Sequence, residues 1–185
     1  MVRCRNSRAA TTVRFSSRRQ QAGFTLIEVL VSSLILSIGL VGVAGLQAVS
    51  LKNNQSAYMR SQASALAYDL ADRMRSNVGG ANAGAYDPAN AASTSTCKTP
   101  VGCTAQELAQ NDLAEWNASL ASNLPMGSGF VCIDSTPYDG ASAASPACDG
   151  NGTRYSVKVW WDDDRDGAIS VTAANTERMS INFQL

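Results

Sequence analysis

The chain has 185 residues and a formal net charge of zero, but its charges are unevenly distributed. Residues 1–23 contain six arginines and no acid, so the remaining 162 residues carry nine basic and fifteen acidic side chains, a net charge of −6. Nucleic-acid binding needs clustered Lys and Arg to neutralise phosphates, so we expect no nucleic-acid partner. Because the chain has no histidine, a Ser or Cys nucleophile would lack its usual base, and we expect no enzymatic activity.

A long apolar run follows the arginine-rich segment. Residues 24–46 contain Glu28 as their only ionisable side chain. A helix of this length, at about 1.5 Å per residue, crosses a hydrocarbon core of about 30 Å. Positive charge before the first span holds that end in the cytoplasm, so the residues after the span are exported. The small residues at which a leader could be cut, Ala22 and Gly23, precede the apolar run, so the anchor stays on the mature chain.

The helical pattern continues beyond the apolar run as an amphipathic segment, residues 47–78. Five apolar residues recur at intervals of three and four, which is typical of one buried helix face: Met59, Ala63, Leu66, Leu70 and Met74. Asp69 and Arg73 have the spacing of a supporting ion pair. We therefore predict one helix over residues 24–77, ended by Val78-Gly79-Gly80 and packed on a domain through this face.

A loop and a short helix are expected over residues 79–128. Residues 79–103 have too few large apolar side chains to form a core, and predict a surface loop. Thr104 and Glu107 have the spacing of a capping box that opens a helix, and Pro125 ends it. The apolar face of this helix consists of Ala109, Leu113, Trp116, Leu120 and Leu124.

Residues 129–185 predict an antiparallel sheet. Four strand-like runs occur at residues 129–134, 154–161, 168–171 and 178–185, separated by short gaps rich in turn residues. The second and fourth runs alternate apolar and polar residues, which indicates half-buried strands. Trp160 and Trp161 point to opposite faces, so either one of them is exposed or a loop covers it. The fold class predicted is α+β, with the long helix covering the sheet.

Four cysteines lie in the exported part, at positions 97, 103, 132 and 148, while Cys4 lies in the arginine-rich segment. An even number in an oxidising compartment suits two disulfides, for which three pairings exist. We favour Cys97 with Cys103 and Cys132 with Cys148, because each pair closes a loop with little apolar surface. A zinc site is disfavoured, since no CxxC spacing and no histidine are present.

An acidic run at residues 162–167 matches part of a calcium-binding loop. Asp162, Asp164, Asp166 and Gly167 fit positions one, three, five and six of such a loop. Its twelfth position is Ala173, which offers no carboxylate, and Glu177 could replace it only with a different loop path. We favour a solvated Asp-rich hairpin turn over a weak calcium site, and expect no other cofactor.

Glu28 needs a cation, because an uncompensated carboxylate in hydrocarbon is costly. The apolar run contains no Lys or Arg. Cleavage after Gly23 would create an α-amino group on Phe24 at nearly the same membrane depth as Glu28. A neighbouring helix staggered by a few residues would then bring its amine to Glu28, which predicts assembly of several copies or relatives through this segment.

At these residues the chain resembles the type IV prepilin family, in its basic leader, in Gly23 followed by Phe24-Thr-Leu-Ile-Glu28, and in the helix that follows. The resemblance implies a long N-terminal helix packed on an antiparallel head. It also implies that a membrane prepilin peptidase cuts between Gly23 and Phe24 and methylates the Phe24 amine. Glu28 would guide docking into a fibre, and the chain would pass from the inner membrane to a pilus on the cell surface.

Within the family, the long helix, the late cysteines and the stretch VKVWWDDDRDG are similar to minor pilins of the PilV type. This implies a scarce subunit that primes assembly near the fibre tip with other minor and major pilins, and raises a tip adhesin as a further partner. The 23-residue leader is long for the family, and Gly39, Gly42 and Gly45 stand where major pilins commonly have a proline. A minor pseudopilin of a type II secretion system and a signal-anchored surface binding protein that never polymerises are the alternatives.

Overall fold

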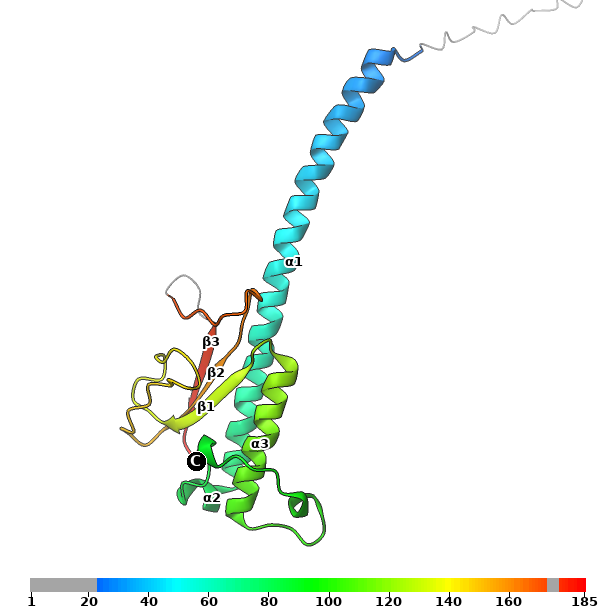
Figure 1. Cartoon of the computed structure of the whole chain (residues 1–185). Helices are drawn as coiled ribbons and strands as arrows, with labels where there is room; N and C mark the ends of the chain where they lie inside the picture. The colour runs from blue at the N-terminus through cyan, green and yellow to red at the C-terminus, as the bar shows by residue number, and fades with distance from the viewer. Residues whose placement is uncertain (1–22, 173–176) are drawn as a thin grey trace, which may run out of the picture. The chain divides into compact units, whose positions relative to one another are not determined.

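The computed structural model describes residues 23–172 and 177–185, so the arginine-rich segment with Cys4, and Ala173, lie outside the described residues. The predicted α+β class is confirmed (Figure 1). The elements in chain order are α1 (Leu26–Ser76), α2 (Val78–Asn82), η1 (Pro88–Asn90), η2 (Ser95–Lys98), α3 (Ala105–Asn123), β1 (Ser128–Ile133), β2 (Tyr155–Trp160) and β3 (Arg178–Phe183).

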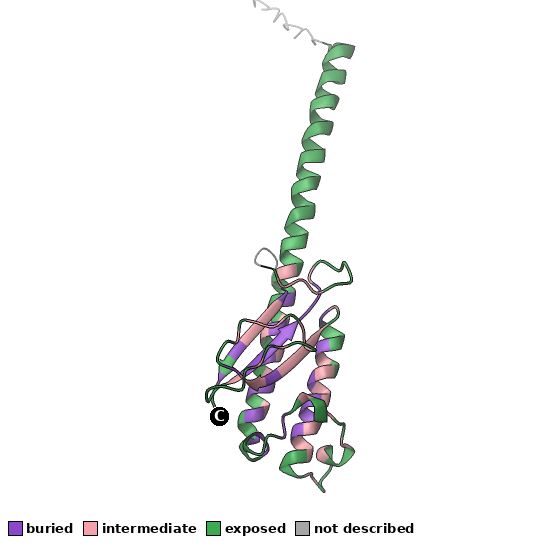
Figure 2. Cartoon of the chain, turned by 60° about the vertical axis from the view of Figure 1, so that its left-hand side comes forward, coloured by how far each residue is buried: buried purple, intermediate pink, exposed green. Residues whose placement is uncertain are grey.

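Two compact units meet between Gln47 and Ala48, and we call them the anchor unit, described over residues 23–47, and the head unit, residues 48–185. All described side chains of the anchor unit are exposed (Figure 2). Helix α1 is long and apolar enough to span a membrane. The hydroxyls of Ser33 and Ser37 donate to carbonyls of the preceding turn, at 2.9 and 2.7 Å, so they satisfy their own hydrogen bonds on an apolar helix.

The apolar face predicted for the second half of α1 packs into the core of the head unit. Met59, Ala63, Leu70 and Met74 are buried, and Leu66 is half-buried against them. The helix ends at Ser76, and the side chain of Asn77 then caps α2 by accepting the Gly80 N–H at 3.2 Å. The Gly79-Gly80 pair therefore belongs to a second helix rather than to a continuous loop, which corrects the loop predicted over residues 79–103.

Helix α3 begins with the predicted capping box. The Thr104 hydroxyl accepts the Glu107 N–H at 3.2 Å, and the Glu107 carboxylate accepts the Thr104 N–H at 2.8 Å. All five residues of the predicted apolar face are buried. The indole N–H of Trp116 donates to the Leu66 carbonyl at 2.8 Å, which joins α3 to α1. Local sequence pattern was sufficient to predict this helix.

The sheet has the order β1-β2-β3, and both strand pairs are antiparallel, as predicted. The strand predicted at residues 168–171 is wrong, since the structure has no strand there and only Val171 of these four residues takes part in a bridge. Instead the Ser170 N–H donates to the Glu177 carboxylate, and the Glu177 N–H donates to the Ser170 carbonyl at 3.0 Å. A buried side chain thus takes the hydrogen bond that a neighbouring strand would have made.

Strand β2 is buried on both faces, which corrects the prediction of a half-buried strand. Ser156, Lys158 and Trp160 are buried on the face that the alternation assigned to solvent. The connection between β1 and β2 covers this face, because the Lys158 ammonium contacts Asp139 and the Pro146 carbonyl there. Trp160 and Trp161 are both fully buried, so the covering loop is the correct alternative.

Candidate functional site

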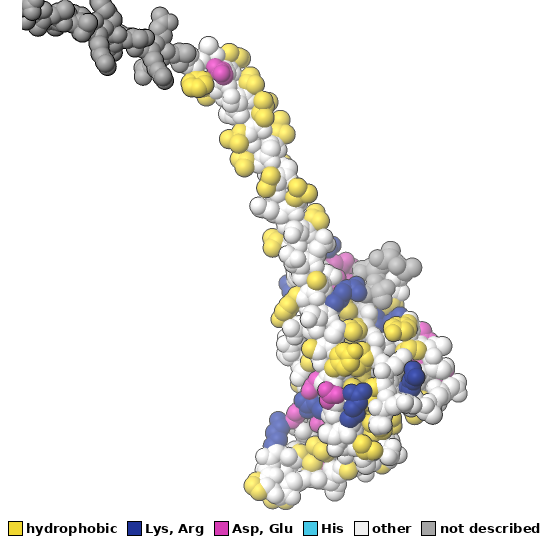
Figure 3. Space-filling view, turned by 180° about the vertical axis from the view of Figure 1, so that it is seen from behind, with side chains coloured by type: hydrophobic (Ala, Val, Ile, Leu, Met, Phe, Trp, Pro, Cys, Tyr) yellow, Lys and Arg dark blue, Asp and Glu magenta, His cyan; other side chains and the backbone are white. Residues whose placement is uncertain are grey.

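The beginning of α1 carries a single acidic side chain on an apolar surface. Glu28 lies in the first turn, and its backbone N–H donates to the Thr25 carbonyl at 3.1 Å. Figure 3 shows an acidic group among hydrophobic side chains near this end of the helix. A shallow hollow of about 410 Å³ adjoins it, lined by Phe24, Glu28, Val29, Ser32, Ser33 and Leu36.

Phe24 and Glu28 thus lie side by side on a surface that the rest of the described chain leaves uncovered. Phe24 is 81% exposed, and Glu28 has no ion pair among the described residues. Residues 23–51 contain no basic side chain. A carboxylate in this setting can bind a cation that another molecule supplies, while the apolar side chains around it pack against lipid or another helix.

Two family models match adjoining stretches of the chain. The prokaryotic N-terminal methylation motif matches residues 18–44, which include Gly23, Phe24 and Glu28, and type IV pilin Tt1218 matches residues 45–114. The chain belongs to the type IV pilin family. Comparison with curated proteins and with solved structures gave no significant match. Proteins of this family are structural, so the pilin is not an enzyme. Its apolar N-terminal helix together with the methylation motif fits a pilin that is anchored in the inner membrane.

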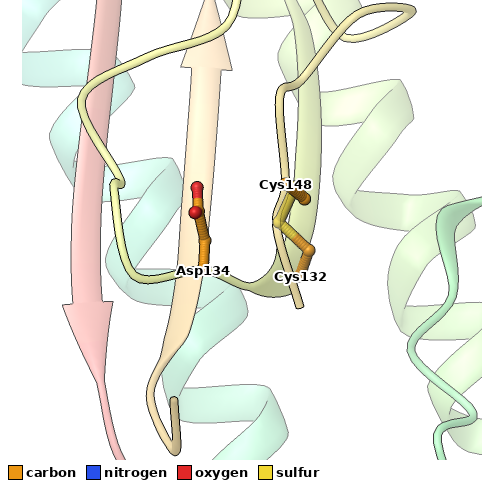
Figure 4. Close-up of side chains that lie close together, drawn as sticks. All are labelled: Cys132, Asp134 and Cys148. Atoms are coloured by element: carbon orange, nitrogen blue, oxygen red, sulfur yellow. A yellow bond between two sulfur atoms is a disulfide. The ribbon is translucent and has the colours of Figure 1, made fainter. Parts of the chain in front are cut away.

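The pilin head has two disulfides, Cys97–Cys103 and Cys132–Cys148, the same pairs that the sequence favoured. The first closes the loop that contains η2. The second joins Cys132 of β1 to Cys148 in the connection that leads to β2, and Figure 4 shows the bond between their two sulfur atoms. Both hold segments that have few apolar side chains of their own.

A buried ion pair lies next to the second disulfide, and sequence reasoning missed it. The side chains of Lys158 and Asp134 are both 0% exposed, with Nζ 2.5 Å from the Asp134 carboxylate. The same ammonium donates to Asp139 at 2.7 Å and to the Pro146 carbonyl at 2.8 Å. The hydrogen bond from Lys158, helped by one from Thr136, lowers the pKa of Asp139. The ammonium donates to three acceptors, the Asp139 carbonyl and carboxylate and the Pro146 carbonyl, while Asp134 compensates its charge as an ion pair without a hydrogen bond to Oδ2, so the buried cation has both acceptors and a counter-charge.

Cys132, Cys148 and Asp134 approach one another within 4.8 Å, a spacing that could suit a metal ion. The two sulfurs are bonded to each other, however, and the carboxylate is paired with Lys158. Figure 4 shows Asp134 to one side of the disulfide that joins Cys132 and Cys148. With the disulfide formed, this group has no free thiolate to offer a metal.

A second polar network joins α1 to α3. The guanidinium of Arg73 contacts Asp69 at 3.0 Å, which is the predicted pair, and also Asp112 and Glu115 of α3, both at 3.2 Å. The Tyr86 hydroxyl donates to Asp112 at 2.8 Å. Burial, followed by the bond to Asp112, raises the pKa of Tyr86. The network therefore ties the segment after α2 to both long helices.

The same network reaches the first disulfide loop. Lys98 of η2 lies 2.8 Å from Glu115, and the Asn111 amide donates to that carboxylate at 2.8 Å. The bonds from Lys98 and Asn111 lower the pKa of Glu115 to about 2. The charged contact of Lys98 thus holds the first disulfide loop against α3, while Ala81, Ala85 and Tyr86 of the same range pack into the core.

The acidic run forms a turn organised by two buried carboxylates. Asp162 accepts the backbone N–H groups of Arg165 and Gly167 at 2.7 and 2.9 Å. Glu177 accepts those of Asp163, at 3.1 Å, and Ser170. Residues 164–167 are exposed, as a solvated turn predicts, whereas Asp162 and Glu177 are only 3% and 0% exposed, so burial of these two carboxylates is the part that the sequence did not predict.

The oxygen atoms that come together here differ from the predicted calcium ligands. Asp162, Asp164 and Glu177 have carboxylate oxygens within 4.8 Å of one another. Asp166 is not part of this group, and instead accepts the Ala168 N–H at 2.8 Å. All three carboxylates accept backbone N–H groups, that of Asp166 reaching Asp164 at 3.4 Å, so N–H dipoles of the turn itself compensate part of their negative charge.

The turn is also fastened to α1. Asp163 accepts the indole N–H of Trp161 at 2.9 Å and the Ser56 hydroxyl at 2.5 Å. The Arg60 guanidinium lies 5.8 Å from the centre of the Trp161 ring, within the range of a cation–π contact. The stretch WWDDDRDG therefore holds the end of β2 against the helix, a role that local pattern did not indicate.

Proposed function

We propose that this pilin is a minor pilin of the PilV type, which primes or modifies assembly of a type IV pilus near its tip. The precursor lies in the inner membrane with its N-terminus in the cytoplasm and its head in the periplasm. The prepilin peptidase cuts between Gly23 and Phe24, and the Phe24 amine is methylated. The subunit then enters the fibre beside other minor and major pilins.

The observation that carries this proposal is the pairing of an exposed apolar helix with one exposed carboxylate. Apolar side chains on every side of the anchor unit need lipid or other helices around them. Glu28 needs a cation at its own depth, and cleavage would place one on Phe24, four residues away in sequence. A neighbouring subunit shifted along the helix axis would cover the apolar surface and also bring its cationic amine to Glu28. The proposal does not include a tip adhesin.

Replacing Glu28 tests this assembly role. In cells that make pili, we expect Glu28→Val to lower the amount of the subunit in sheared fibres at least about tenfold, the factor that corresponds to about 1.4 kcal/mol. Cleavage of the leader should continue. Ser32→Ala, in the same hollow, is the matched control and should be incorporated normally. Normal incorporation of Glu28→Val would contradict the proposal.

Two alternative functions predict different experimental results. A minor pseudopilin of a type II secretion system has the same kind of helix, and its loss would abolish secretion while pili remain. A signal-anchored surface protein that never polymerises would keep its Gly23-Phe24 bond, and Glu28→Val would change nothing in fibres. Loss of surface pili with secretion intact favours the minor pilin.

A calcium ion at the acidic turn is a separate question. We expect the turn to fold without calcium, because Asp162 and Glu177 accept backbone N–H groups. Calorimetric titration of the full chain with calcium, with Asp164→Ala as the control, decides the matter. A binding heat that this substitution abolishes would add a calcium site, whereas equal traces would remove it.

A further inference from the structure

A polar hollow lies where the acidic turn meets α1. It has a volume of about 440 Å³ and is lined by Ala48, Leu51, Lys52 and Gln55 of the helix and by residues 163–165 of the turn. The Ser56–Asp163 bond fixes the turn against the helix. Arg165 has a φ of 60°, held by the bond from its N–H to Asp162, and its side chain is exposed. The turn is therefore a fixed platform for a charged side chain.

The depth of this hollow in the membrane follows from the position of charges along the chain. Residues 29–51 contain no charged side chain, and Lys52 is the first charge after Glu28. Asp163 and Asp164 line the same hollow as Ala48, and carboxylates do not enter hydrocarbon without a large cost. The hydrocarbon must therefore end before Ala48.

This limit agrees with the length of the span. Residues 24–47 number 24, which at about 1.5 Å per residue gives about 36 Å of helix, enough for a core of about 30 Å with some tilt. The hollow consequently lies at the level of the lipid headgroups while the pilin is in the membrane.

The charges that line the hollow match a zwitterion. Lys52 and Arg165 supply two positive charges, and Asp163 and Asp164 supply two negative charges. Asp163 is engaged by Ser56 and Trp161, whereas Asp164 is exposed. A phosphate suits Lys and Arg, and an ammonium group beside it suits the Asp164 carboxylate. Because the four charges cancel, an anionic headgroup gains no net attraction here.

We propose that this hollow binds the headgroup of a phosphatidylethanolamine molecule in the periplasmic leaflet. Lys52 and Arg165 hold the phosphate, and Asp164 accepts hydrogen bonds from the ethanolamine ammonium. A choline headgroup has no N–H to donate, so it binds less well. The inference rests on the membrane-inserted precursor of the proposed function, and adds a lipid that sets the depth of the subunit before it leaves the bilayer.

Native mass spectrometry of the full 185-residue chain in detergent tests the site. The chain is titrated with phosphatidylethanolamine, phosphatidylcholine and phosphatidylglycerol that have the same acyl chains. We expect phosphatidylethanolamine to be retained most, and Lys52→Gln or Arg165→Gln each to weaken its retention about fivefold, the factor that corresponds to the ~1 kcal/mol net contribution of one hydrogen bond. Arg154→Gln, an exposed cation elsewhere on the head, is the control. Melting temperatures establish that each variant is folded.

Equal retention of the three lipids, or retention that Lys52→Gln and Arg165→Gln leave unchanged, would overturn the site. Tighter retention of phosphatidylglycerol, lost in the same variants, would overturn the headgroup assignment in favour of a plain phosphate site. Unchanged lipid retention with lost incorporation into fibres would make the hollow a contact between pilins. The measurement uses the uncut chain, so it is independent of Gly23-Phe24 cleavage and of Glu28→Val, which test the proposed function.

Discussion

The two halves of α1 differ in where their apolar side chains find a partner. Over residues 24–47 every described side chain is exposed, whereas beyond Met59 a buried side chain recurs every three or four residues. The second half packs on α3 and the sheet of its own chain. The first half is apolar on all sides, so its partner must come from outside the chain. One helix thus serves two environments, and its polar residues mark the change between them.

Charged groups differ between the units in the same way. Lys158 is fully buried in the head, but Asp134 and Asp139 of the same chain surround its ammonium. Glu28 in the anchor has no such partner among the described residues. The head therefore compensates its charges internally, while the anchor depends on another molecule to do so.

Truncating a buried side chain of the head should destabilise the fold far more than truncating an exposed side chain of the anchor. Trp116→Ala should lower the free energy of unfolding by about 3–5 kcal/mol, because it leaves a cavity and removes the bond to Leu66. Leu36→Ala, in the exposed anchor, should change it by less than about 0.5 kcal/mol. Urea unfolding of the full chain in mild detergent, followed by tryptophan fluorescence, measures both. Similar losses for the two variants would contradict a head that folds without the anchor's side chains.

Replacing Lys158 tests whether the head compensates its buried charges internally. Lys158→Met should destabilise the head by about 3 kcal/mol, because it leaves the Asp134 carboxylate buried without its partner. Adding Asp134→Leu should recover most of the loss, since the second charge is then gone as well. Lys98→Met, at an exposed pair, is the control and should cost less than about 1 kcal/mol. A small effect of Lys158→Met in the same unfolding assay would show that this pair is not buried as described.

A smaller effect is expected from pH at Glu115. Its pKa is about 2 in the folded head and about 4.5 in the unfolded chain, so its contribution is present above about pH 4.5 and is lost as pH falls towards 2. The side chain is 29% exposed, and screening limits the contribution to about 1 kcal/mol. The difference in unfolding free energy between the native chain and Glu115→Gln should therefore shrink between pH 5 and pH 2.5. If the difference in unfolding free energy stays constant across this range, the charged contacts of Glu115 do not cause it.

Patterns confined to one element were predicted correctly, and contacts between distant segments were not. The spacing of Met59, Ala63, Leu70 and Met74 predicted the buried face, and Thr104 with Glu107 predicted the start of α3. These features depend on residues three or four positions apart. The strand predicted at residues 168–171 is wrong, because the Glu177 side chain, seven residues beyond Ser170, accepts the Ser170 N–H that a neighbouring strand would have bound.

The candidate site shows the same division. Gly23, Phe24 and Glu28 form a short motif and were predicted by it, although their roles in cleavage and assembly remain predictions. Lys158 occupies a polar position in an alternating strand, which predicts exposure, and nothing nearby in sequence reveals the loop that covers it. The polar hollow between the acidic turn and α1 also went unpredicted, because Lys52 and Arg165, which both line it, are more than a hundred residues apart.

The mass of the mature N-terminal peptide shows whether processing provides a cation for Glu28. The subunit is isolated from the membranes and sheared fibres of cells that make pili, and its N-terminal peptide is analysed by mass spectrometry. We expect a chain that begins at Phe24 with one methyl group on its amine, so that a cation is available at the depth of Glu28. A mature chain that still carries its arginine-rich leader would contradict it.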